Sequence, residues 1–283
     1  YPGTSAAVMG LFSGLHTKVA VYMLYRLYVQ LFGLDQRWNV LIIVIMIISM
    51  MIGAFGGLAE NSIRRVLGYQ MLNGMPFILV MLAFTSDDPR RALAAGIMYT
   101  IHHMLTVGSL ILASGAIEET YGTGLLTKLS GLARRDPIIA WIFAAGAFSV
   151  VGFPPFSGMW GKLMIVFEVA RNGGAWAWIA IAAIIIASFA AFLAMLRVWR
   201  EAFWGHDLPS DKVPDELIIR KKLMAPSAAL ILVSLGMFIF SGVVIDAVET
   251  AAEQLLDTTA YTDTILGDDS AALPNIDDIQ EGR

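Results

Sequence analysis

Residues 151–166 read VGFPPFSGMWGKLMIV, and this stretch lies inside an apolar run that is long enough to cross a membrane. It holds two adjacent prolines, Pro154 and Pro155, which remove backbone donors and interrupt a helix. It also holds Lys162 and three glycines that allow close packing or bending. An irregular backbone at membrane depth persists only where protein or a water-filled cavity surrounds it. The stretch therefore predicts a broken helix with an ionisable group beyond the break, an arrangement that membrane transporters use for ion sites.

The alternative is a proline kink that carries an incidental lysine. A charged side chain in lipid is costly, so a lysine without a role would be selected against. We therefore favour the interpretation in which the break admits water and exposes backbone carbonyls. Lys162 would then exchange protons with that water.

The composition of the whole chain places it in a membrane. Of its 283 residues, 57% are hydrophobic and 15% are charged, whereas soluble domains have about 45–50% apolar and about 25% charged residues. The apolar runs are too long and too uniform for the strands of a barrel. The fold class is therefore an all-α polytopic membrane protein. The net charge of −4 does not favour nucleic acid as a partner, and the absence of cysteine excludes disulfides and cysteine-ligated metal.

Seven hydrophobic runs are near the length of about 20 residues that a helix needs to cross the hydrocarbon core. They cover residues 6–31, 39–59, 63–85, 92–117, 137–170, 174–204 and 223–249. The chain thus divides into a transmembrane helical domain, residues 1–249, and an acidic tail, residues 250–283. The chain starts with Tyr1, and no charged segment precedes the first run. We therefore expect no signal peptide, and we expect the sequence to be the C-terminal part of a longer protein.

The distribution of Lys and Arg predicts the orientation of these runs. Eleven of these residues lie in or directly beside the connections after the second, fourth and sixth runs, and five lie on the opposite side. The side with more positive charge is expected to face the cytoplasm. The chain would then start in the cytoplasm, and the acidic tail would be extracellular. Arg64 and Arg65, at the start of the third run, would anchor it at the cytoplasmic interface. The polar connection 205–222 would be a surface linker or a hairpin that contacts a partner.

Lys18 lies about twelve residues into the first run and is therefore expected near the middle of the membrane. An ammonium group there is expensive unless it is paired or hydrated. One alternative is a structural lysine whose head group reaches the interface. The other is a relay group that binds and releases protons. The long apolar flanks on both sides favour the relay.

His102 and His103 lie in the middle of the fourth run. Imidazole titrates near neutrality and can donate and accept hydrogen bonds at once. Adjacent helical residues point about 100° apart, so the two cannot face one pathway equally. Tyr99 and Thr106 lie at helical spacing from them and offer hydroxyl partners as candidate pathway-lining residues. For the better placed histidine we favour a proton relay over an interhelical hydrogen bond. Metal ligation is not expected, because no carboxylate stands nearby in the sequence.

Five segments resemble, in order, the antiporter-like membrane subunits. They read YPGTSAAVMGLFSGLHTKVAVYMLYRL, LAENSIRRVLGY, IHHMLTVGSLILASGAIE, GFPPFSGMWGKLMI and LRVWREAFWG, and they fall between residue 1 and about residue 205. That family comprises the large subunits of Mrp-type multi-subunit Na+/H+ antiporters and the proton-pumping subunits of respiratory complex I and membrane hydrogenases. The stretches PPFSGMWGK and EAFWG are most similar to the D subunits of the Mrp type.

The resemblance implies a fold of fourteen helices in two inverted five-helix repeats, of which this chain holds helices 8 to 14. It implies that the central lysine of helix 8 is Lys18, that the histidine of helix 11 is His103, and that the terminal ionisable residue of broken helix 12 is Lys162. Helices 1 to 7, with the family's essential glutamate and first lysine, would precede this chain. Val107 departs from the pattern, because many relatives carry a lysine there. In the third run, QMLNGMP (residues 70–76) also replaces the family's usual pattern of Ser, Gln and Gly. A proton wire through helix 11 would then need water, Thr106 or His102.

The sequence thus predicts the proton-conducting subunit of a hetero-oligomeric Na+/H+ antiporter in the bacterial cell (plasma) membrane. It would relay protons through Lys18, His103, Lys162 and His102 in a hydrated half-channel, with no cofactor, no metal and no catalytic site of its own. Its expected partners are the other subunits, membrane lipids, and H+ and Na+ as transported ions. Two alternatives are a proton-pumping membrane subunit of a redox-driven complex, and a structural subunit with a degenerate channel. Val107 and the altered pattern of the third run, residues 70–76, motivate the second of these.

Overall fold

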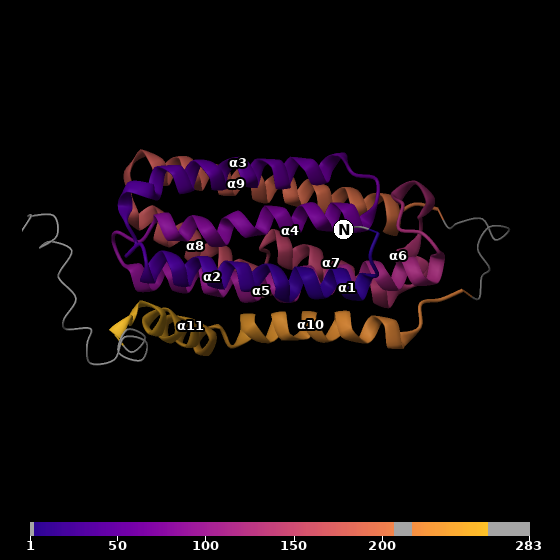
Figure 1. The fold of residues 1–283 in the computed structure, drawn as a ribbon. Coiled ribbons are helices and arrows are strands. Elements are labelled where there is room, and N and C mark those ends of the chain that lie inside the picture. Colours follow the sequence, from indigo (N-terminus) through magenta and orange to yellow (C-terminus); the bar gives the residue numbers. More distant parts are fainter. Residues whose placement is uncertain (1–2, 207–216, 260–283) are drawn as a thin grey trace, which may run out of the picture.

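The computed structural model describes residues 3–206 and 217–259, and this part of the chain is helical apart from short connections and an isolated β-bridge between Ser62 and Leu125. The long helices lie side by side along one axis (Figure 1). Six helical stretches are long and apolar enough to cross a membrane, and a further span is interrupted. The expected all-α membrane fold with about seven spans is therefore confirmed.

The first four expected runs form these elements: α1 (Ala6–Leu11), the π-helical η1 (Phe12–His16), α2 (Thr17–Gln30), the 3-10 turn η2 (Gln36–Trp38), α3 (Asn39–Ala59), α4 (Ile63–Leu79), the 3-10 turn η3 (Val80–Ala83) and α5 (Pro89–Tyr121). The remaining described chain forms the 3-10 turn η4 (Leu126–Lys128), α6 (Leu132–Arg135), α7 (Pro137–Val151), α8 (Ser157–Asn172), α9 (Gly174–Val198), the π-helical η5 (Trp199–Phe203), α10 (Lys221–Ile239) and α11 (Ser241–Leu256).

The central element is α5, which contacts α1, α4, α7, α8, α10 and α11. The Asp88 carboxylate begins this helix by accepting a hydrogen bond from the backbone N–H of Arg91 at 3.1 Å, and Pro89 occupies the first turn. Gly122 ends the helix at φ 69°, a left-handed conformation that favours glycine. Because neighbours surround α5, the two histidines halfway along it are buried in the interior.

The helix break that the two prolines predict is confirmed. Helix α7 ends at Val151 and α8 begins at Ser157. Gly152 follows α7 at φ 99°, where a side chain would be strained. In Figure 1 the two short helices lie end to end, with α8 toward the end of the molecule that holds α11. The break therefore lies in the middle of the bundle.

The single helix expected over residues 223–249 is instead two helices, α10 and α11, which meet at Phe240. Helix α11 continues to Leu256, past the end of the expected run. Its Glu249 forms an ion pair with Arg90 of α5 at 3.4 Å, so polar contacts as well as apolar ones hold it in place. Residues 260–283 of the expected acidic tail and residues 207–216 of the polar connection lie outside the described residues.

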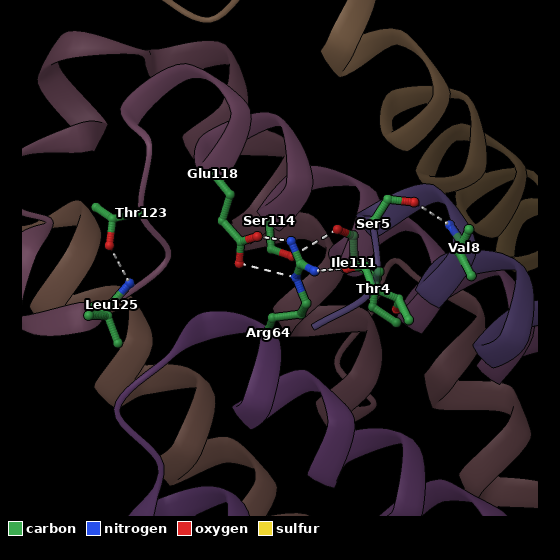
Figure 2. A network of polar contacts seen from close by, with 9 residues as sticks. All are labelled: Thr4, Ser5, Val8, Arg64, Ile111, Ser114, Glu118, Thr123 and Leu125. Atoms are coloured by element: carbon green, nitrogen blue, oxygen red, sulfur yellow. Dashed lines mark hydrogen bonds and ion pairs between the residues drawn. The ribbon is translucent and has the colours of Figure 1, made fainter. Parts of the chain in front are cut away.

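An ion pair joins the start of α4 to the end of α5 (Figure 2). Arg64 contacts the Glu118 carboxylate, with Nε 3.2 Å from Oε1, and its guanidinium also donates to the backbone carbonyl of Thr4. The two side chains are only 12% and 19% exposed. Arg65, in contrast, is 59% exposed and lies 3.5 Å from Glu60. Of the two arginines expected as interfacial anchors, Arg64 is turned inward and ties two helices together.

The substitution Glu118→Ala is expected to lower the melting temperature of the purified protein, because it leaves the inward-facing Arg64 without its carboxylate. Breaking a buried ion pair costs about 3–5 kcal/mol, and the partial exposure of this pair reduces the expected loss to about 1–3 kcal/mol. Glu119→Ala is the matched control, since Glu119 and its partner Arg220 are 57% and 77% exposed. Equal melting temperatures for the two variants would contradict the structural role of Glu118.

Candidate functional site

Lys18 of α2 and His103 of α5 are in direct contact in the interior. The Nζ atom of Lys18 lies 2.8 Å from His103 Nδ1, and it donates to the Ser13 carbonyl at 2.9 Å and to Thr17 Oγ1 at 3.2 Å. Lys18 is 5% exposed and His103 is 2% exposed. An ammonium group has three donors, and these three acceptors satisfy them. The contact therefore suits a proton that passes between lysine and imidazole.

The other nitrogen of the His103 ring completes this arrangement. Nε2 lies 3.4 Å from the backbone carbonyl of Gln70 on α4. A carbonyl only accepts, so Nε2 carries hydrogen and Nδ1 is free to accept from Lys18. Gly74 makes the approach possible, because a Cβ there would overlap the imidazole. The histidine is thus held between two helices with its basic nitrogen turned to Lys18.

The turn before Lys18 is π-helical, which the sequence did not indicate. The Ser13 carbonyl in this turn accepts from two side chains, Thr17 Oγ1 at 3.0 Å and Lys18 Nζ at 2.9 Å. Single π-helical turns inside α-helices often occur at functional sites. Here the wider turn supplies a carbonyl that holds the ammonium of Lys18.

Buried polar atoms also line the contact of α4 with α3. Both side-chain amide atoms of Gln70 and the Oδ1 atom of Asn73 have no protein partner within the described residues. Gly57 of α3 faces the Gln70 side chain, where a Cβ would lie 3.5 Å from Nε2, and Gly53 of α3 packs against the backbone of Asn73. Buried polar atoms of this kind are ordinarily satisfied by ordered water. The polar atoms of Gln70 and Asn73 therefore offer hydrogen-bonding partners to water on this side of His103.

Lys162 of α8 lies at the break. Its Nζ atom donates to the Val151 carbonyl at 2.8 Å and to Ser188 Oγ at 2.9 Å. In a continuous helix the Val151 carbonyl would accept from residue 155, but Pro155 has no N–H. Gly152 lets the lysine stem pass closely, since a Cβ there would lie 3.0 Å from Lys162 Cδ. The prolines thus create the carbonyl that binds the ammonium, as the sequence predicts.

Two aromatic rings lie between Lys162 and the histidines. Lys162 Nζ is 5.3 Å from the centre of the Phe77 ring, and Phe77 stacks on Tyr99 with centroids 5.3 Å apart. The Tyr99 ring is 5.2 Å from His102 and 6.0 Å from His103. The structure therefore brings Lys18 and His103 together and places His102 and Tyr99 beside them. Lys162 lies beyond the stacked rings of Phe77 and Tyr99.

His102 faces away from Lys18. Its Nδ1 atom lies 2.9 Å from Ser157 Oγ of α8 and 3.3 Å from Thr106 Oγ1. The hydroxyl of Thr106 is thus placed as the sequence expects, as a partner of a histidine. Val107, in contrast, is fully buried in an apolar cluster that includes Leu67 and Leu110. The polar side of α5 therefore continues through Thr106 and not through position 107.

Sequence reasoning missed several polar neighbours of the site. Ser149 and Ser157 flank the Pro-Pro break, which was the available signal for them. Ser188 and Ser234 come from later helices and carry no local signal, because their relevance depends on which helices become neighbours. Phe77 has no polar atom and lies in an apolar run, so its sequence position carries no signal for the site.

Comparison with known proteins identifies the family. The family model described as NADH:quinone oxidoreductase/Mrp antiporter, TM, matches residues 1–192. The D subunit of the Na(+)/H(+) antiporter of Bacillus subtilis (strain 168) is 31% identical over 94% of this chain and 52% of its own length. The N subunit of the NADH-quinone oxidoreductase of Hydrogenovibrio crunogenus is 31% identical over 76% of this chain and 44% of its own length. A chain in the structure of the Mrp complex from Dietzia sp. DQ12-45-1b has 32% identity and a TM-score of 0.86, over 94% of this chain and 56% of that chain. The chain spans about half the length of the curated relatives that it matches.

Proposed function

This chain belongs to the NADH:quinone oxidoreductase/Mrp antiporter transmembrane family, and we propose that it is a proton-conducting part of a multi-subunit monovalent cation/H+ antiporter in the bacterial cell membrane. The observation that carries the proposal is the buried contact of 2.8 Å between Lys18 Nζ and His103 Nδ1. Two basic groups at this distance share one proton more easily than they hold two, since two like charges this close repel. Such a pair accepts and releases protons in turn.

The proposed route has two ends. One is the Lys18–His103 pair, next to the partnerless polar atoms of Gln70 and Asn73, where water has hydrogen-bonding partners. The other is Lys162 at the helix break, on the carbonyl of Val151. His102 and Tyr99 lie between them. Protonation at one end would change the affinity of the other end for protons through electrostatic repulsion, and this coupling would link proton flux to cation extrusion.

The protein would then be a transporter subunit without a catalytic centre of its own. Its partners would be the other subunits of the complex and the surrounding lipid, with H+ and Na+ as the ions moved. The similarity to the Na(+)/H(+) antiporter D subunit of Bacillus subtilis over 94% of this chain supports this assignment.

A second candidate is the proton-pumping membrane subunit of a redox-driven complex. The similarity to the NADH-quinone oxidoreductase N subunit of Hydrogenovibrio crunogenus supports it, and the buried lysines and histidines would serve that function equally well. Purification of the full-length protein from its native membrane, followed by identification of the subunits that accompany it, separates the two. Redox subunits in the preparation would favour the second candidate, and antiporter subunits the first.

The histidines provide a test of the route. His103→Ala in the complete complex is expected to lower Na+-dependent proton movement in everted vesicles by about 10²-fold or more, the usual effect of removing a positioned proton-transfer group. His102→Ala is expected to have a smaller effect, because His102 does not contact Lys18. The amount of assembled complex in the membrane is the control. Equal and negligible effects of both substitutions would mean that α5 carries no protons.

A further inference from the structure

Four buried hydroxyls and the imidazole of His102 form a closed ring of contacts. His102 Nδ1 lies 2.9 Å from Ser157 Oγ, which lies 2.7 Å from Ser234 Oγ. Ser234 Oγ lies 3.1 Å from Ser149 Oγ, and Ser149 Oγ lies 2.8 Å from Thr106 Oγ1. Thr106 Oγ1 returns to His102 Nδ1 at 3.3 Å. All five side chains are at most 1% exposed. We refer to these five side chains as the hydroxyl ring.

The hydroxyl ring joins four helices at the Pro-Pro break. Ser149 belongs to the last turn of α7, and Ser157 is the first residue of α8. Both contact Ser234 of α10, while His102 and Thr106 belong to α5. The break is what brings Ser149 and Ser157 to one point. Ser234 is the contribution of α10, a helix in which the sequence indicated no functional residue.

Hydroxyl groups donate and accept, and they rotate to suit their neighbours. When His102 Nδ1 lacks hydrogen, Ser157 donates to it. Ser234 then donates to Ser157, Ser149 donates to Ser234, and Thr106 donates to Ser149. When Nδ1 carries hydrogen, it donates to Ser157 and every hydroxyl turns the other way. These changes are rotations and break no covalent bond.

The other nitrogen of His102 faces α8. A Cβ at Gly158 would lie 2.8 Å from His102 Cε1 and 3.1 Å from Nε2, so the ring of His102 sits over the first turn of that helix. Lys162 follows Gly158 by one helical turn on the same face. The Nδ1 atom of His102 thus faces the hydroxyl ring. Its Nε2 atom faces the side of α8 on which Lys162 lies.

We propose that Thr106, Ser149, Ser157 and Ser234 are positioning residues that keep buried His102 paired whether or not Nδ1 carries hydrogen. With hydrogen on Nδ1, which donates to Ser157, the Nε2 atom of His102 is free to gain and lose a proton. In the other tautomer Ser157 donates to Nδ1, so neither tautomer leaves the buried Nδ1 unsatisfied, which would be costly. His102 then connects the Lys18–His103 pair with Lys162. The inference rests on the proposed function and deepens it, because it assigns the connection that Val107 leaves open.

The titratable groups around His102 come from three elements. His103 and Tyr99 lie on α5, Lys162 lies on α8, and Lys18 of α2 lies behind His103. Helix α7 has no titratable residue in its sequence, and the lysines of α10 are at its far end, at positions 221 and 222. The hydroxyl ring therefore brings no charged group to His102. It acts on the imidazole through hydrogen bonds alone.

A second pair of serines provides the matched control. Ser227 of α10 and Ser109 of α5 lie 2.9 Å apart, and each hydroxyl also donates to the other residue's carbonyl. Both are fully buried, like Ser234. Ser227 lies two turns from Ser234 on the same helix and belongs to no contact of the hydroxyl ring. It shows what the loss of an ordinary interhelical serine contact does.

The experiment measures Na+-dependent proton movement as a function of pH in everted vesicles that contain the complete complex. Ser234→Ala is expected to lower the maximal rate about tenfold, because Ser149 and Ser157 lose the hydroxyl that joins them, and to displace the pH profile. Ser234→Thr keeps a hydroxyl and is expected to retain most of the rate and the original profile. Ser157→Ala should behave like Ser234→Ala, and Ser227→Ala like the wild type. Assembly of each variant is measured in parallel.

Two results would overturn the inference. One is a wild-type rate and pH profile for Ser234→Ala and Ser157→Ala. The other is an equal loss for Ser227→Ala with no change of profile in any variant, which would make the serines ordinary packing contacts. Lys18→Ala is measured in the same vesicles to separate this outcome from failure of the proposed function. If Lys18→Ala is inactive and Ser234→Ala is normal, the role of the hydroxyl ring is rejected and the proposed function stands.

Discussion

Replacement of Lys18 by alanine is expected to abolish Na+-dependent proton movement while the complex still assembles. The substitution removes the partner of His103 Nδ1 at 2.8 Å and leaves the Ser13 carbonyl with Thr17 alone. A loss of about 10²- to 10⁴-fold is the usual consequence of removing a positioned proton-transfer group. No neighbouring side chain of α2 replaces it, because Thr17 has no basic group. The measurement is dequenching of a pH-sensitive dye in everted vesicles after addition of Na+.

Lys128→Ala is the matched control for this experiment. Lys128 is an exposed lysine at the end of η4, far along the chain from the site, and its replacement is expected to leave transport unchanged. Full transport by Lys18→Ala at normal assembly would rule out a relay role for Lys18. The contact with His103 would then be structural only.

The second large effect is expected at Lys162. Among the described residues of α7 and α8, Lys162 is the only titratable group at the break, where it donates to the Val151 carbonyl. Lys162→Leu removes this group and should stop transport. Lys162→Glu keeps a group that binds a proton there, and when protonated it can donate to the Val151 carbonyl or to Ser188. Partial transport should therefore survive in Lys162→Glu. Proton movement with each variant is compared at matched expression.

The comparison of the two variants separates three roles of Lys162. Transport by Lys162→Leu at the wild-type rate would make it a structural lysine, and the end of the route would lie elsewhere. If both variants are inactive, the site needs a positive charge, and Lys162 would act on Lys18 by electrostatic repulsion. Ser188→Ala, which removes one acceptor at 2.9 Å and keeps the ammonium, is expected to reduce transport only moderately.

Features that depend on local chemistry could be read from the sequence. The prolines at 154 and 155 cannot donate backbone hydrogen bonds, so a break was required wherever the rest of the chain went. The lengths of the apolar runs likewise predicted helices, and α3 begins and ends within the expected run. The same reasoning placed Lys18, His102 and His103 in the middle of apolar runs, and the structure shows all three buried.

Features that depend on distant neighbours could not be read in this way. Lys18 and His103 are 85 residues apart, and Ser149 and Ser234 are also 85 apart. Their contacts follow from the packing of α5 against its neighbours, for which a single sequence holds no signal. Arg64 resembled an interfacial anchor because its partner, Glu118, lies 54 residues away. The division of the last run at Phe240 was missed because Val243, Val244 and Ile245 follow it, so the apolar run continues past the break.

The central claim is that Lys18 works by releasing its proton, and Lys18→Arg tests it most directly. Arginine keeps the positive charge and several donors for the Ser13 carbonyl and His103, but a guanidinium stays protonated and does not release its proton. The complete complex, purified and reconstituted in proteoliposomes, is given a Na+ gradient, and internal pH is followed with assembly as the control. The account predicts that the Lys18→Arg complex assembles and moves no protons. Proton movement at the wild-type rate would contradict it, because a fixed charge at position 18 would then be sufficient.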